Sequence, residues 1–180
     1  MGRRTGTRAA RAAVLALLGA VAAGAVGVGT QLPASGAPGR SDVARVKAAT
    51  AQFHDVAAAQ AAGYVPVSPC EELPGEGTMG VHYLNPALAG DGAVDPLRPE
   101  VLLYLPTEDG LRLVGVEWFV AEQAAGGTRP TVLGQPFEGP MDGHAPGMPR
   151  HYDKHLWIWA DNPAGAWAPW NPALSCPKEG

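Results

Sequence analysis

The sequence has few of the residues and motifs that identify common classes of protein. Charged residues make up only 17% of its 180 residues, and cysteine occurs twice. It contains no GxSxG motif, no HExxH motif and no glycine-rich phosphate-binding loop, so the common hydrolase and nucleotide-binding classes have no support. A disordered chain is also excluded, because 46% of the residues are hydrophobic.

Basic residues are scarce beyond the N-terminal segment. The formal net charge is −4, but residues 1–40 contain five arginines and no acidic residue. The remaining chain has 8 basic residues against 17 acidic ones, which gives a formal charge of −9. Because nucleic acids and anionic membrane surfaces repel an acidic domain, we expect neither nucleic-acid binding nor membrane association of the mature protein.

Residues 1–37 are predicted to be a signal peptide. Four arginines lie within residues 1–11, and an apolar stretch from Val14 to about Val28 is followed by small residues and Pro33. We expect cleavage to leave a mature chain that begins between residues 28 and 41, with an uncleaved anchor as the alternative. Residues 38–180 are long enough for one globular domain, which we expect to be secreted, extracellular or in the cell envelope.

Export predicts a disulfide bond between Cys70 and Cys176. These are the two cysteines of the chain, and disulfides persist outside the cytoplasm. Two buried thiols are the alternative. A cysteine metal site is disfavoured because neither residue belongs to a CxxC motif.

The hydrophobic pattern predicts an α+β fold. Apolar residues at helical spacing after Ser41-Asp42 indicate an amphipathic N-terminal helix that ends at Gly63. Strands are predicted at 64–67, 79–84, 101–105, 111–120 and 156–160, with a hairpin turn at residues 107–110. We expect the helix to pack on a mainly antiparallel sheet, followed by a long Pro/Gly loop over 126–149 and a C-terminal strap that carries two tryptophans.

Four residues are predicted to bind a metal ion: His82, Glu117, His151 and His155. Glu117 lies in an apolar strand, where an ionised carboxylate needs a cation or strong hydrogen-bond donors. His151 and His155 can reach one ion if the residues between them form a turn. Imidazoles with a carboxylate suit Zn, Cu, Mn, Fe or Ni, and the spacing does not choose among them.

Other polar residues near this set have weaker predicted roles. His144 and Tyr152 are candidates for the vicinity of an open coordination position, and Asp153 is a candidate for holding an imidazole through a hydrogen bond. The alternatives stay open: His82 can be a hydrogen-bonded core residue, and Glu117 can pair with an arginine. The arginines considered are Arg112, Arg129 and Arg150.

Several runs of residues resemble a family of secreted, actinobacterial-type bacterial proteins of unknown function. The runs are Gly80-Val81-His82-Tyr83, Gly115-Val116-Glu117-Trp118, His151 through Gly165, Asn171-Pro172 and Ser175-Cys176. The resemblance implies export and a compact domain, and it implies no activity. The His/Glu ligand set is weakly similar to that of cupins, but Glu117 is too far along the chain from His82 to match the cupin motif.

Three functions are compatible with these observations. The first is an exported metal-binding protein, with enzymatic activity undetermined. The second is a metal-free module that binds a small molecule or a glycan in an aromatic pocket. The third is a structural protein of the cell envelope.

Overall fold

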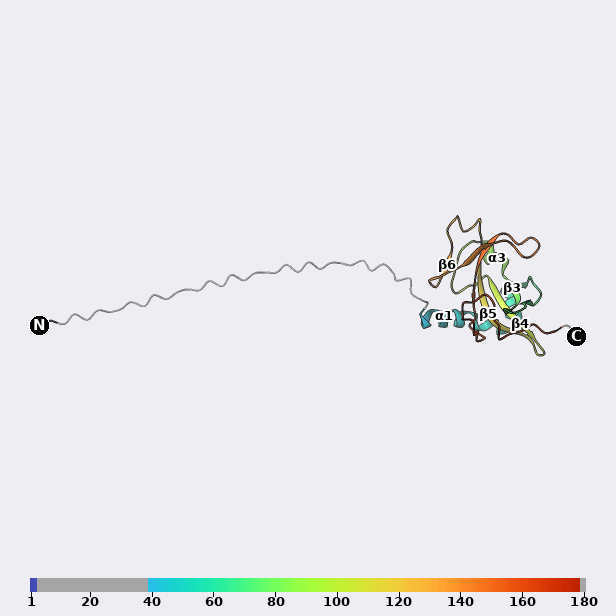
Figure 1. The fold of residues 1–180 in the computed structure, drawn as a ribbon, viewed down its shortest axis with the longest axis horizontal. Helices are drawn as coiled ribbons and strands as arrows, with labels where there is room; N and C mark the ends of the chain where they lie inside the picture. Colours follow the sequence, from blue (N-terminus) through green and yellow to red (C-terminus); the bar gives the residue numbers. More distant parts are fainter. Residues whose placement is uncertain (3–38, 179–180) are drawn as a thin grey trace. The chain divides into compact units, whose positions relative to one another are not determined.

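The protein has an α+β fold in which a mainly antiparallel sheet is accompanied by a few short helices (Figure 1). The computed structural model describes Met1, Gly2 and residues 39–178. Apart from its first two residues, the segment predicted to be a signal peptide lies outside the described residues. None of the described helices has the length and hydrophobicity that a membrane-spanning segment needs.

Seven strands form the sheet in the order β1-β3-β4-β5-β9-β8, and β2 also pairs with β3. All of their pairings are antiparallel. The strands are β1 (Val65–Pro66), β2 (Glu71–Leu73), β3 (Gly77–Leu84), β4 (Val101–Thr107), β5 (Gly110–Ala121), β8 (Glu138–Met141) and β9 (His151–Leu156). Strands β6 (Thr131–Val132) and β7 (Gln135–Pro136) pair with each other.

The predicted hairpin is confirmed. Strands β4 and β5 pair from Val101↔Glu117 to Thr107↔Gly110, so residues 108 and 109 form the connecting turn. Their central residues are buried on both faces, which explains the nearly continuous hydrophobic sequence of the two strands. The pair forms the middle of the sheet, where Figure 1 shows β5 running through the domain.

The N-terminal helical region consists of three segments: α1 (Arg40–Thr50), a 3-10 turn at Ala51–His54, and α2 (Val56–Ala61). The predicted cap at Ser41-Asp42 is wrong, because α1 follows Gly39 without a side-chain cap. The chain bends at Asp55, whose carboxylate accepts a hydrogen bond from the amide of Ala57 and so caps α2. A further short helix, α3 (Pro86–Ala89), follows β3.

Two hydrophobic clusters cover the two faces of the sheet. The larger cluster joins the helices to one face through Val46, Phe53 and Ala59. The smaller cluster covers the other face and contains Leu103 and Phe119. The residues predicted to bind metal lie on the face with the smaller cluster.

The last sheet strand lies earlier in the sequence than predicted. We expected it at 156–160, whereas β9 covers His151–Leu156. The polar sequence His-Tyr-Asp-Lys-His does not look like a buried strand. All six residues of β9 are nevertheless buried, because the strand lies between β5 and β8 in the sheet. The predicted Pro/Gly loop is likewise not irregular throughout, since β6, β7 and β8 lie within it.

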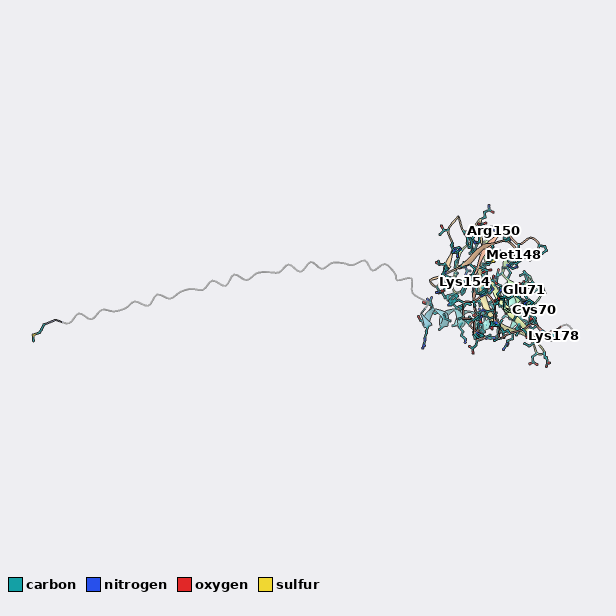
Figure 2. All side chains as sticks on the ribbon, in the orientation of Figure 1. Cys70, Glu71, Met148, Arg150, Lys154 and Lys178 are labelled. Atoms are coloured by element: carbon teal, nitrogen blue, oxygen red, sulfur yellow. A yellow bond between two sulfur atoms is a disulfide. The ribbon has the colours of Figure 1, made fainter. Side chains whose placement is uncertain are left out.

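The predicted disulfide is confirmed between Cys70 and Cys176, whose Cα atoms are 5.9 Å apart. It holds the C-terminal segment against the start of β2. The same segment is tied to β3 by two backbone hydrogen bonds between Thr78 and Asn171. Because Glu71 directly follows Cys70, the disulfide also fixes a segment that borders the candidate site (Figure 2).

Candidate metal centre

Antiparallel pairing brings His82, Glu117 and His155 together from three strands. Glu117 lies directly opposite His155 on β9 and opposite Val101 on β4. His82 on β3 lies opposite Leu103 of β4. Since directly paired residues project from the same face of a sheet, the three side chains share one face and approach each other over β4.

Both imidazoles approach the same carboxylate oxygen. Glu117 Oε2 lies 3.5 Å from Nε2 of His82 and 3.7 Å from Nε2 of His155. One donor atom from each of the three residues lies within 4.8 Å of the others. The prediction that Glu117 is buried and faces His82 is therefore confirmed, with 4% of Glu117 exposed.

These distances are too long for hydrogen bonds but fit ligands around a shared ion. Glu117 Oε2 and His155 Nε2 are buried and have no hydrogen-bond partner. Tetrahedral ligands about 2.0 to 2.2 Å from a Zn²⁺ ion are roughly 3.4 Å apart, close to the two measured contacts. The three residues can therefore hold a metal ion if the donor atoms of His82 and His155 move slightly closer together.

Burial disfavours the charged forms of all three groups. Loss of solvent raises the pKa of Glu117 well above its usual value, and the nearby carboxylates of Asp153 and Glu71 raise it further. Burial lowers the pKa of His155 to about 4 and also lowers the pKa of His82. Neutral imidazoles are the form that binds metal ions, and a cation would stabilise the ionised form of Glu117.

The arginines considered as partners of Glu117 are engaged elsewhere. Arg150 pairs with Glu122 and Asp142. Arg129 donates hydrogen bonds to backbone carbonyls of residues 137 and 139. Arg112 is exposed near the β4–β5 turn. None of the three provides the cation that the buried carboxylate needs.

Ser68 contacts both the ring and the backbone amide of His82. Its hydroxyl donates to the carbonyl of Pro69 and accepts from the backbone amide of His82, at 2.8 and 3.1 Å. When the hydroxyl proton points to the Pro69 carbonyl, the 3.0 Å contact between Ser68 Oγ and His82 Nδ1 is made by a proton on Nδ1. The lone pair of His82 is then on Nε2, the atom that faces Glu117, as a metal ligand requires.

No protein-family model, curated protein or solved structure matches this chain.

The fourth predicted ligand, His151, does not join the group. It lies four residues from His155 on the same strand, a separation of about 13 Å in extended backbone, and no turn intervenes. Its Nδ1 donates to the carbonyl of Pro149, and its Nε2 lies 3.6 Å from Asp153. The prediction that both histidines bind one ion depended on a turn and is corrected by the strand.

Asp153 lies between the two histidines of β9. One carboxylate oxygen is 3.9 Å from Nδ1 of His155 and the other is 3.6 Å from Nε2 of His151. Burial acts to raise the pKa of Asp153, but the neighbouring imidazoles lower it below its usual value. An ionised Asp153 is placed to orient His155 once its Nδ1 carries a proton.

The two other predicted neighbours have different positions. Tyr152 packs in the larger hydrophobic cluster on the opposite face, because side chains alternate along β9, so its predicted role at the site is wrong. His144 lines the cavity beside the site, with its ring 5.5 Å from that of His151.

Ser68 and Glu71, which border His82, were not predicted from the sequence. Glu71 Oε1 lies 3.7 Å from His82 Nδ1. The two residues flank Cys70, so the predicted disulfide was the only sequence signal that placed this segment in a fixed position.

Proposed function

We propose that the domain is exported and binds one divalent transition-metal ion through His82, Glu117 and His155. The observation that supports this most strongly is the burial of Glu117 between two imidazoles, with donor atoms that lack hydrogen-bond partners. The disulfide agrees with an oxidising compartment.

The ligand set favours a site with an open coordination position. Structural zinc sites usually have four protein ligands, whereas two histidines and one carboxylate leave room for water or a substrate. The site also borders a cavity of about 440 Å³ that His82 and Glu117 help to line. These features suit a metal that contacts a small molecule.

Metal titration of the purified, disulfide-bonded protein tests this proposal. We expect one Zn²⁺ or Co²⁺ ion per chain by calorimetry, and loss of this binding in His155→Ala. His54→Ala is the matched control, because His54 is an exposed histidine on the helical side of the domain. A saturating metal at about 100 times its Kd should add about 2.7 kcal/mol to the free energy of unfolding of the wild type.

The comparison of variants with and without chelator separates binding from folding. If His155→Ala lowers stability equally in metal and in chelator, His155 is only a core residue and the proposal fails. Binding of the same stoichiometry and affinity by His155→Ala would also contradict it.

A metal-free module for small molecules is the second candidate, and the cavity favours it. In that case the wild-type protein would bind no metal at micromolar concentrations.

A further inference from the structure

The cavity beside the candidate metal centre has walls with a distinctive chemistry. It holds about 440 Å³, within the range of pockets that bind small organic molecules. His82 and Glu117 form part of its lining, and Ser68 and Glu71 lie at the same side. A molecule in the cavity would therefore lie next to the proposed metal.

Most of the remaining lining is apolar and comes from the sheet, from the segment 144–149, from the region of α3 and from Val67. The sheet contributes Leu84, Val101, Phe119 and Ala121, and the segment 144–149 contributes Met148 together with three other apolar residues. Val101 and Phe119 are buried members of the smaller hydrophobic cluster, with Met148 packed against it. These walls favour an apolar ligand body, because burying it removes hydrocarbon surface from water.

The charges around the cavity disfavour anionic ligands. Among the described residues that line it, none is a lysine or an arginine, while Glu71 and Glu117 are acidic. Arg150 follows the lining segment directly, but its guanidinium is paired with Glu122 and Asp142. The two histidines that line it are His82, a proposed metal ligand, and His144. The carboxylates of Glu71 and Glu117 balance the two positive charges of a divalent ion, so a phosphate, a sulfate or an additional carboxylate on the ligand would find no excess positive charge and no lysine or arginine.

Few of the side chains that line the cavity can form hydrogen bonds: they are Ser68, Glu71, His82, Glu117 and His144. The Ser68 hydroxyl is already occupied by the Pro69 carbonyl and by two nitrogen atoms of His82. A glycan would bury many hydroxyl groups here without partners, which costs free energy for each unsatisfied group. This distinguishes the cavity from a typical sugar-binding site.

We propose that the cavity binds an uncharged small molecule with an apolar body and one nitrogen or oxygen donor that contacts the metal. This inference rests on the proposed function, since the donor would occupy the open coordination position. It identifies the substrate class of the site: small, neutral and mostly hydrocarbon, excluding nucleotides, sugar phosphates and oligosaccharides.

Three probes of the Co²⁺-loaded protein test the inference: imidazole, 4-phenylimidazole and 4-(imidazol-4-yl)benzoate. We expect 4-phenylimidazole to bind at least tenfold more tightly than imidazole. We expect the affinity of the benzoate to be at least tenfold lower than that of 4-phenylimidazole. The Co²⁺ absorption spectrum should change on binding. Removal of the metal by a chelator should lower the affinity for 4-phenylimidazole at least tenfold.

Filling the cavity should remove the preference for 4-phenylimidazole over imidazole without preventing metal binding. We expect Ala121→Leu to bind Co²⁺ like the wild type but to bind 4-phenylimidazole no better than imidazole. The matched control is Ala57→Leu on the exposed surface of α2. Met148→Ala is a second variant outside the sheet (Figure 2), and it should weaken only the phenyl-bearing probe.

Each contrary outcome has a distinct meaning. If Co²⁺ binds but the phenyl group gives no gain, or the benzoate binds as tightly, the ligand class is wrong and the metal site stands. If no Co²⁺ binds, the proposed function fails, and this inference fails with it.

Discussion

At Glu117 the carboxyl group is buried between two imidazoles, and no lysine or arginine of the described chain pairs with it. Its environment raises its pKa while it lowers the pKa of His155. The two groups therefore affect stability in opposite directions as pH changes, and both effects act on the metal-free protein.

Glu117→Gln should stabilise the metal-free protein at neutral pH and abolish metal binding. The folded-state pKa of Glu117 is raised, so its proton supports folding below about pH 4.5 and this support is lost as pH rises. The free energy of unfolding of Glu117→Gln relative to wild type should increase by roughly 1.4 kcal/mol per pH unit above that point, until Glu117 ionises. Urea denaturation of both proteins in the presence of a chelator measures this difference. A variant less stable than wild type at pH 7 in chelator would contradict the prediction.

His155 should produce the opposite pH dependence. Its folded-state pKa is about 4 against 6.5 when unfolded, so its contribution is present above pH 6.5 and lost as pH falls toward 4. The loss should reach about 3 kcal/mol. We expect the difference between wild type and His155→Gln in chelator to shrink over this range. An unchanged difference between pH 7 and pH 4.5 would show that His155 is not held neutral.

Ser68→Ala should weaken metal binding by roughly 10- to 100-fold, the usual effect of losing a hydrogen bond that orients a histidine ligand. The hydroxyl contacts Nδ1 of His82 at 3.0 Å and so orients the ring with Nε2 toward Glu117, and its removal frees the ring to turn. Calorimetric titration measures the affinity, and Ser41→Ala on the exposed surface of α1 is the control. Equal affinities of the two variants would remove Ser68 from the account.

Among the elements, β9 shows why the site could be predicted only in part. The burial of Glu117 followed from its place in an apolar run of β5, and the hairpin with β4 followed from the turn residues. The polar residues of β9 gave no strand signal, because their burial depends on pairing with β5 and β8. Without knowledge of that strand, the sequence could not show that Tyr152 and His155 lie on opposite faces. It also could not show that His151 is too far from His155 to share an ion.

The position of β9 predicts different consequences for its two histidines. His151→Gln should still bind one metal ion with an affinity near that of wild type, because its Nε2 faces Asp153 rather than Glu117. His155→Gln should lose binding, since its Nε2 faces Glu117. Calorimetry on the two variants provides the comparison. Loss of binding in both would restore His151 as a ligand.

For the whole molecule, the disulfide links the C-terminal segment to the wall of the site. Cys70 lies between Ser68 and Glu71, both of which contact His82. The pair also closes a loop with a sequence separation of 106 residues. The sequence predicted this bond from the number of cysteines, but it could not show that the bond positions residues around a metal site.

Replacing both cysteines by serine should lower the free energy of unfolding by about 2 to 5 kcal/mol. It should also weaken metal binding, because the segment that carries Ser68 loses its covalent attachment. Chemical denaturation and metal titration of the folded variant measure the two effects. If stability falls while metal affinity stays the same, the disulfide supports the fold but does not position the site.

The central claim is that His82, Glu117 and His155 bind one ion together. X-ray absorption spectroscopy of the Zn²⁺-loaded protein tests this most directly. We predict nitrogen and oxygen ligands about 2.0 to 2.2 Å from the metal, with scattering from two imidazoles that falls to one in His82→Ala. A spectrum with no imidazole, or an imidazole count that His82→Ala leaves unchanged, would contradict the claim.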